Sequence, residues 1–174
     1  KEQKWPDAQL SGINVTHIWT QNEEISKDIA AAALIRKIVD NPEDLIGQVD
    51  GILLARDDAE NHLTLARPFL EAGLPIFIDK PLAITLADAK KMLNLQTYEG
   101  QLFSCSSLRY AEELLLSEKE LNRLEGVVYV EATIQKSWAK YAVHLIEPIV
   151  TCLNNRGSLI RVEGNKNGQI VKAQ

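Results

Sequence analysis

Short apolar runs alternate with longer amphipathic segments along the first part of the chain, and this alternation restricts the fold more than any other feature. Strands are expected at 13–20, 49–55, 76–78 and 101–106. The helices expected between them cover about 22–33, 42–46, 58–71 and 85–95. Strands and helices that alternate at this spacing form βαβ units. The sequence therefore predicts an α/β fold with a Rossmann-like, doubly wound parallel sheet.

The strand at 76–78 is followed by a lysine in a position that favours a functional role. Before this strand, Glu71-Ala72-Gly73 has the pattern of a helix end with a left-handed glycine cap. Three apolar residues are too few for a helix and are typical of a strand buried on both faces. Lys80 follows directly, at the strand end where open α/β sheets bind ligands. The alternative is a solvated lysine in a turn, and the position favours the site.

The pattern changes after Arg109. An amphipathic helix is expected at 110–124, a strand with one covered face at 127–134, and a mostly apolar helix at 138–153. Two further strands, 159–162 and 169–171, lie around glycines and predict an antiparallel hairpin. This order is typical of an α+β unit. We therefore predict two domains, a Rossmann-like domain at 1–107 and an α+β domain at 108–174.

Two expected features of such a protein are missing from the sequence. No Gly-x-Gly-x-x-Gly motif occurs, and the first predicted strand is followed by Thr20-Gln21-Asn22-Glu23, which cannot cradle a pyrophosphate. The second region supplies only part of a sheet. We therefore expect the first strand, its glycine-rich turn and the rest of the second sheet to belong to a longer protein.

Composition restricts the partners and the compartment. A net charge of −5 argues against nucleic acid or an anionic membrane as the main partner. The longest apolar run, 29–35, is far shorter than a membrane span, and the first residues lack a signal-peptide core. Cys105 and Cys152 are interpreted as reduced thiols, and the scattered histidines and cysteines predict no metal site. We expect a cytoplasmic protein.

The motif order between residues 49 and 83 resembles the glucose-fructose oxidoreductase, inositol dehydrogenase and MocA family. The segment reads VDGILLA at 49–55, then His62, then EAG at 71–73 and DKPLA at 79–83. Arg109 after the next strand and His144 on the later helix extend the resemblance over residues 13 to 165. It implies a Rossmann domain for NAD or NADP, followed by a domain with a large, mostly antiparallel sheet that forms the oligomer interface.

The resemblance also implies a reaction, which is hydride transfer between NAD(P) and a hydroxyl or carbonyl of a sugar, cyclitol or similar polyol. Lys80 would stabilise alkoxide character as a fixed cation, and His144 would accept the hydroxyl proton as a base that titrates near neutral pH. The candidate catalytic residues are Lys80, His144 and Lys140. The candidate cofactor contacts, most of them near strand ends, are Thr20, Ala55, Arg56, Asp57, His62, Asp79, Lys80 and Arg109.

The chain departs from the family pattern at several of these positions. Asp79 replaces a glutamate, Arg56-Asp57 stands where Thr-Pro or Asn-Pro is usual, and Lys140 replaces an aspartate four residues before His144. Residues four apart share a helix face, so we expect Lys140 to face the same site and to disfavour the protonated imidazole. Thr20 replaces the acidic residue that would hold the ribose of NAD, which favours NADP weakly.

Three functions stay open on this basis. The first is an NAD(P)-dependent oxidoreductase that acts on a small polar molecule and forms a homo-oligomer through the apolar faces of 127–134 and the following strands. The second is a non-catalytic dinucleotide-binding sensor or regulatory protein, and the third is a Rossmann-like protein that binds no nucleotide. Individual residues also keep alternatives: His144 could be a core histidine, Arg109 could pair with a helix carboxylate, and Tyr141 could line the pocket or the core.

Overall fold

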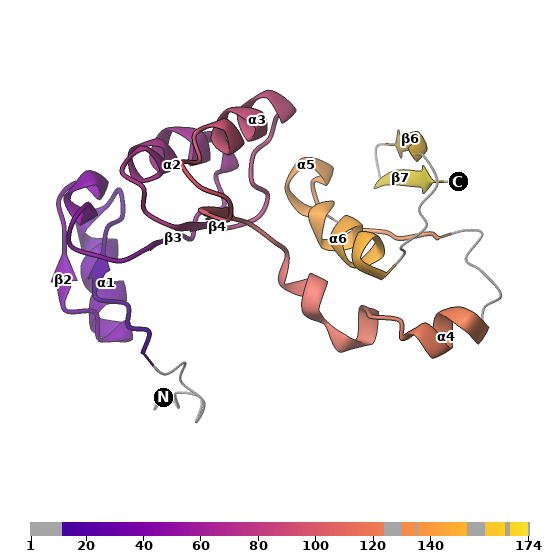
Figure 1. Ribbon diagram of the computed structural model, residues 1–174, viewed down its shortest axis with the longest axis horizontal. Coiled ribbons are helices and arrows are strands. Elements are labelled where there is room, and N and C mark those ends of the chain that lie inside the picture. The colour runs from indigo at the N-terminus through magenta and orange to yellow at the C-terminus, as the bar shows by residue number, and fades with distance from the viewer. Residues whose placement is uncertain (1–11, 124–129, 135, 153–158, 166–167, 174) are drawn as a thin grey trace. The chain divides into compact units, whose positions relative to one another are not determined.

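The computed structural model describes residues 12–123, 130–134, 136–152, 159–165 and 168–173, and the chain divides into two compact units, residues 1–50 and 51–174 (Figure 1). In the first unit, strand β1 (His17–Ile18) pairs in parallel with β2 (Lys37–Ile38), and helix α1 (Glu23–Ala33) connects them. The predicted strand at 13–20 is thereby confirmed over a shorter length. Strand β2 was not predicted, because two residues give no alternation to detect.

Helix α1 begins where the sequence predicts. The Asn22 side-chain oxygen accepts hydrogen bonds from the backbone N–H groups of Glu24 at 2.9 Å and Ile25 at 3.3 Å. Such a cap satisfies donors that the first helical turn leaves unpaired, and the acidic residues beside it favour the positive end of the helix dipole. The short helix predicted after Asn41 is also present, as the 3₁₀ turn η1 (Pro42–Leu45).

The second unit begins with a three-stranded parallel sheet in the order β3-β4-β5. The strands are β3 (Ile52–Leu54), β4 (Ile76–Ile78) and β5 (Leu102–Phe103), and the helices that connect them are α2 (His62–Glu71), preceded by the 3₁₀ turn η2 (Ala59–Asn61), and α3 (Leu86–Asn94). This arrangement confirms the predicted βαβ units. Because all three strands are parallel, their carboxyl ends lie at the same edge of the sheet.

The core of this sheet lies on one face. Alternate residues of β3 and β4 are buried with side chains of α2 and α3, and the buried set is Ile52, Leu54, Ala66, Phe69, Leu70, Ile76, Ile78 and Met92. On the other face, Leu53 is 67% exposed and Phe103 is 47% exposed. The expectation that 76–78 is buried on both faces is therefore met only in part: Phe77 is half-buried and its ring lies 6.0 Å from that of Phe103.

Gly73 ends the second helix as predicted. Its φ angle is +78°, its N–H donates to the carbonyl of Leu70 at 3.0 Å, and the N–H of Leu74 donates to the carbonyl of Phe69 at 3.0 Å. A left-handed residue after the last helical turn allows these bonds, and glycine adopts that conformation without a steric penalty. The chain then turns directly into β4.

The helix predicted at 110–124 is wrong. The 3₁₀ turn η3 (Ser107–Tyr110) ends at the first residue of this segment, and the described residues after it form a second 3₁₀ turn, η4 (Glu112–Leu114), and a separate helix, α4 (Glu118–Arg123). Ser117 and Glu120 explain the interruption: the N–H of Ser117 donates to Oε2 of Glu120 at 2.8 Å, and the N–H of Glu120 donates to the Ser117 hydroxyl at 3.3 Å. This reciprocal pair is a capping box, which starts a new helix.

The remaining elements follow the sequence prediction more closely. The apolar helix is present as α5 (Trp138–Tyr141) and α6 (Val143–Cys152), with a break at Ala142. The antiparallel hairpin is confirmed as β6 (Leu159–Asn165) and β7 (Gly168–Ala173). Of the predicted strand at 127–134, residues 127–129 lie outside the described residues, and 130–134 form no strand.

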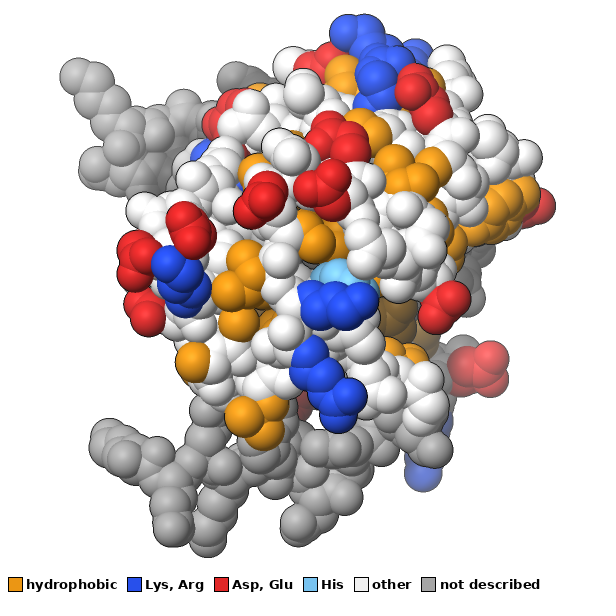
Figure 2. Space-filling model, turned by 90° about the vertical axis from the view of Figure 1, so that its left-hand side faces the viewer, with side chains coloured by type: hydrophobic (Ala, Val, Ile, Leu, Met, Phe, Trp, Pro, Cys, Tyr) orange, Lys and Arg blue, Asp and Glu red, His pale blue; other side chains and the backbone are white. Residues whose placement is uncertain are grey.

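On the face drawn in Figure 2, basic side chains stand in small groups among acidic and hydrophobic ones. This mixture agrees with the net charge of −5. Among the helices of the described residues, none combines the length and the apolar character that crossing a membrane requires.

Candidate active site

The carboxyl edge of the β3-β4-β5 sheet carries several of the predicted site residues. Arg56 and Asp57 follow β3, Asp79 and Lys80 follow β4, and Ser106 lies shortly after β5. This is the edge at which open α/β sheets bind their ligands. The loops after the first two strands are therefore placed as the sequence predicts.

Ser106 and His144 are joined across this edge. The Ser106 hydroxyl lies 2.6 Å from Nδ1 of His144, and it also accepts a hydrogen bond from the N–H of Leu108 at 3.1 Å. The backbone N–H of Ser106 donates to Oε2 of Glu147, one turn after His144 on α6. When Nδ1 carries the ring proton and donates to Ser106, Nε2 is left as the proton acceptor.

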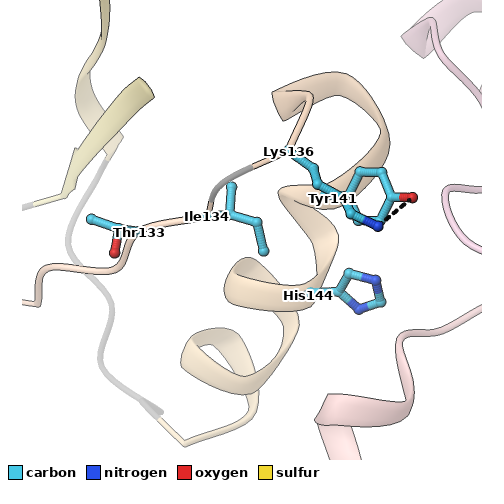
Figure 3. A pocket seen from close by; sticks show the side chains of 5 residues that line it. All are labelled: Thr133, Ile134, Lys136, Tyr141 and His144. Carbon is cyan, nitrogen blue, oxygen red and sulfur yellow. Dashed lines mark hydrogen bonds between the residues drawn. The ribbon is translucent and has the colours of Figure 1, made fainter. Parts of the chain in front are cut away.

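Two ammonium groups lie against the ring of Tyr141. Nζ of Lys80 is 4.7 Å from the ring centroid and Nζ of Lys136 is 4.6 Å from it, both within cation–π range. Lys136 also donates to the Tyr141 hydroxyl at 3.4 Å (Figure 3). The ring of Tyr141 is 5.8 Å from that of His144. Lys80, Tyr141 and His144 are therefore brought into one cluster.

An open hollow of about 480 Å³ adjoins this cluster. It is lined by Thr133, Ile134, Lys136, Tyr141 and His144, and Figure 3 shows these side chains from close by. None of the five is acidic. The volume lies in the range of small-molecule sites, which is about 300 to 1,000 Å³.

The surroundings of His144 favour its uncharged form. Burial lowers the pKa of His144 below its ordinary value of 6.5, and the positive charge of Lys80 lowers it further. Lys136 acts in the same direction, whereas the carboxylates of Asp79 and Glu147 oppose the change. The ring is therefore available as a proton acceptor at neutral pH.

Lys140 lies differently from the sequence expectation. Its ammonium group donates to the backbone carbonyl of Asp57 at 3.3 Å and pairs with Oε1 of Glu60 at 3.3 Å. The helix breaks at Ala142, between Lys140 and His144, so the four-residue spacing does not place the two on one continuous helical face. Lys80 and Lys136 are the cations that lower the pKa of His144. The expectation that Lys140 lowers this pKa is therefore corrected, because its ammonium group contacts Asp57 and Glu60 instead.

The predicted cofactor contacts in the second unit lie on the loops after β3 and β4, at the start of α2 and in η3. Arg56 is paired with Asp58 through Nε and Nη2, and this guanidinium holds the pKa of the Asp58 carboxyl well below its usual range. His62 is completely buried, with its ring nitrogens 3.2 Å from the carbonyl oxygen of Leu82 and 3.0 Å from that of Arg56. His62 therefore supports the two loops.

Three further cofactor candidates are Ala55, Arg109 and Thr20. Ala55 directly follows β3, and Arg109 lies in η3. Thr20 belongs to the first unit, where its hydroxyl donates to the carbonyl of Asn22 at 2.6 Å.

Loops at the carboxyl ends of parallel strands, with cations beside them, fit a dinucleotide. No group of acidic, histidine or cysteine side chains in the described residues is arranged to hold a metal ion.

Three residues at or beside this cluster were not predicted as site residues: Ser106, Lys136 and Glu147. For two of them, the position in the sequence could have indicated a place in the site. Ser106 ends a predicted strand on the side where ligands bind, and Glu147 follows His144 at the three-residue spacing that shares a helix face. Lys136 precedes the helix in an irregular segment and carried no such signal.

Comparison with known proteins identifies the family. Residues 2–107 match the model of the oxidoreductase family with an NAD-binding Rossmann fold, which includes the glucose-fructose oxidoreductases, inositol dehydrogenases and MocA. The chain belongs to this family. The match confirms the Rossmann fold that the sequence predicts.

Individual relatives agree with the family. Inositol 2-dehydrogenase 1 from Saccharopolyspora erythraea is 38% identical over 63 residues, which are 35% of this chain and 18% of that protein. Levoglucosan dehydrogenase in complex with NADH and levoglucosan has a TM-score of 0.64 at 16% identity, over 87% of this chain and 48% of that chain. A dehydrogenase from Clostridium difficile has a TM-score of 0.65 at 17% identity, over 91% of this chain and 57% of that chain. The two structures show the fold, and this chain spans about half of their length.

Proposed function

We propose that the protein transfers a hydride between NAD(P) and a CH–OH group of a sugar, cyclitol or similar polyol. The observation that carries the proposal is the hydrogen bond between Ser106 and His144 beside the ammonium group of Lys80. It pairs an oriented, uncharged base with a fixed cation, which are the two groups that alcohol oxidation requires.

In the direction of oxidation, the substrate carbon loses a hydride, its hydroxyl loses a proton, and a carbonyl forms. A nicotinamide, when bound, supplies the ring carbon that takes up the hydride. Nε2 of His144 accepts the proton, while Nδ1–H donates to Ser106. The Lys80 ammonium stabilises the negative charge that develops on the substrate oxygen. Glu147 positions Ser106 by accepting its backbone N–H.

The cofactor contacts that we propose are Thr20, Ala55, Arg56, Asp57, His62, Asp79, Lys80 and Arg109. Among them, Thr20 in place of an acidic residue supports NADP over NAD.

We also propose a homo-oligomer formed by the second region, and a cytoplasmic location, which the two free thiols Cys105 and Cys152 support. Light scattering of the full-length protein at micromolar concentration tests the assembly, and a strict monomer would exclude it.

The test is cofactor binding followed by turnover. We expect the full-length protein to bind NADPH or NADH, measured separately by fluorescence, and to oxidise at least one member of a panel of inositols, hexoses and sugar acids. Lys80→Ala should lower kcat by about a hundredfold or more, a much larger change than the loss of one of several cofactor contacts produces in cofactor affinity. Lys90→Ala, on the exposed side of α3, is the matched control and should change neither.

The outcomes separate the alternatives. Turnover by Lys80→Ala within about threefold of the unmodified protein would remove Lys80 from the mechanism. Cofactor binding without turnover on any member of the panel would favour the sensor or regulatory alternative. A protein that binds neither dinucleotide would leave only the third alternative.

A further inference from the structure

We infer that the hollow beside His144 binds an anionic group of the substrate, a carboxylate or a phosphate, and that Lys136 is its principal contact. This inference deepens the proposed function and rests on it, because it names the charge class of the polyol. The substrate would be a sugar acid or a sugar phosphate rather than a neutral polyol.

The lining of the hollow carries the first part of the argument. Among the described residues, the lining consists of one cation, one histidine, two hydroxyl-bearing residues and one isoleucine, with no carboxylate and no amide side chain. An ammonium group offers three donors and no acceptor. A neutral polyol presents hydroxyl protons that need acceptors, whereas a carboxylate or phosphate presents acceptors only. The donors of Lys136 therefore match an anion better than a neutral sugar.

The second part of the argument is that the ammonium groups of Lys136 and Lys80 have no carboxylate partner among the described residues. No acidic side chain of the described residues pairs with Lys136 or Lys80, although six other ion pairs form. Instead, both ammonium groups lie within 5 Å of the Tyr141 ring centroid. Two like charges this close to the same ring disfavour each other, and an anion in the hollow would relieve that repulsion.

Nearby carboxylates do not cancel this charge inside the hollow. Glu147 already accepts the backbone N–H of Ser106, and neither Glu147 nor Asp79 lines the hollow. With His144 uncharged at neutral pH, the charged group of the lining is Lys136. Lys136 lines the hollow and Lys80 does not, so Lys80 remains available for the reacting oxygen while Lys136 holds the anion.

The test compares three ligands with one carbon skeleton: D-glucitol, D-gluconate and D-glucitol 6-phosphate. Their affinities for the full-length protein with its reduced cofactor are measured by calorimetry. We expect one of the two anions to bind at least about tenfold tighter than glucitol, as a charge-assisted hydrogen bond would give. The tighter of the two anions identifies the carboxylate or the phosphate as the group recognised.

Variants at position 136 make the test specific. Lys136→Gln should lower the preference for the anion over glucitol about tenfold, and Lys136→Glu should reverse it. Lys90→Gln removes the same charge from the exposed side of α3 and should leave the preference unchanged. Circular dichroism verifies that each variant is folded, which is expected because Lys136 is exposed.

Several results would overturn the inference. They are glucitol binding as tightly as either anion, an equal loss of affinity for all three ligands in Lys136→Gln, and no binding of any of the three. The measurement is independent of turnover. A protein that prefers the anion through Lys136 but oxidises no polyol would therefore contradict the proposed function and support the anion site.

Discussion

The Ser106 hydroxyl and Nδ1 of His144 lie 2.6 Å apart, across 38 residues of sequence. Ser106 follows the last strand of the β3-β4-β5 sheet, and His144 lies near the start of α6. The bond fixes the orientation of the imidazole relative to the sheet edge. When Nδ1 donates in this bond, Nε2 is the nitrogen that can act as a base.

Removal of this bond should impair the chemical step. Ser106→Ala is expected to lower kcat about tenfold or more, with KM and cofactor affinity nearly unchanged, because the imidazole loses the partner that sets its tautomer. Ser107→Ala is the control, since Ser107 is the exposed neighbour. Ser106→Thr, which keeps a hydroxyl, should recover part of the loss. Equal kcat values for Ser106→Ala and Ser107→Ala would show that Ser106 does not position His144.

The pH dependence of activity should follow the lowered pKa of His144. Since the uncharged ring accepts the proton, kcat/KM should rise with pH through a limb that lies below pH 6.5 and reach a plateau at neutral pH. Lys80→Met removes a charge that lowers this pKa, so an NMR titration should show the pKa of His144 closer to its ordinary value.

Lys140→Met is the matched control for that titration. The Lys140 ammonium is directed to Glu60 and Asp57, so its removal should move the pKa of His144 much less than removal of Lys80. An equal rise in Lys140→Met and Lys80→Met would restore the original expectation that Lys140 and His144 share a site.

The ion pair between Lys140 and Glu60 gives a prediction about stability. Both side chains are partly exposed, 35% and 56%, so their coupling energy in a double-mutant cycle should be about 0.2–1 kcal/mol and should shrink in high salt. Lys140→Asp would bring a second carboxylate beside Glu60 and should destabilise the fold, whereas combination with Glu60→Lys should restore stability. Urea unfolding measures all four proteins, and strictly additive effects would contradict the pairing.

Gly73 gives a prediction about the backbone. Gly73→Ala should lower the free energy of unfolding by about 1 kcal/mol, because its φ of +78° is strained for a residue with a Cβ atom. No neighbouring atom lies within 4 Å of the position that a Cβ would take, so the cost comes from the backbone and not from a clash. Gly73→Asn should be less harmful, because asparagine tolerates the left-handed region. Equal losses for alanine and asparagine would argue against this cause.

Local signals in the sequence predicted local structure well. Asn22 before an amphipathic segment, Gly73 after one, and three apolar residues at 76–78 each report on their immediate neighbours, and the structure confirms all three. The error at 110–124 has a local cause as well. The serine and the glutamate at positions 117 and 120 form a capping box, which the amphipathic pattern concealed.

The candidate site was less predictable because its contacts are not local. The bond between Ser106 and His144 joins distant segments, and no spacing rule reports it. The direction of the Lys140 side chain depends on Glu60, about half the chain away in sequence, and on a helix break at Ala142. Helical spacing assumes an unbroken helix, and that assumption failed at this residue.

His62 lies beneath two loops, with one ring nitrogen toward the carbonyl of Arg56 and the other toward that of Leu82. A neutral imidazole has one N–H, so the ring donates to one of these carbonyls and packs against the other, and a displacement of either loop disturbs the surroundings of a completely buried side chain. The loop after β3 and the loop with Lys80 therefore behave as a single preorganised body. The conformational entropy of ordering them is already lost on folding, so a ligand that contacts both loops does not have to supply it on binding.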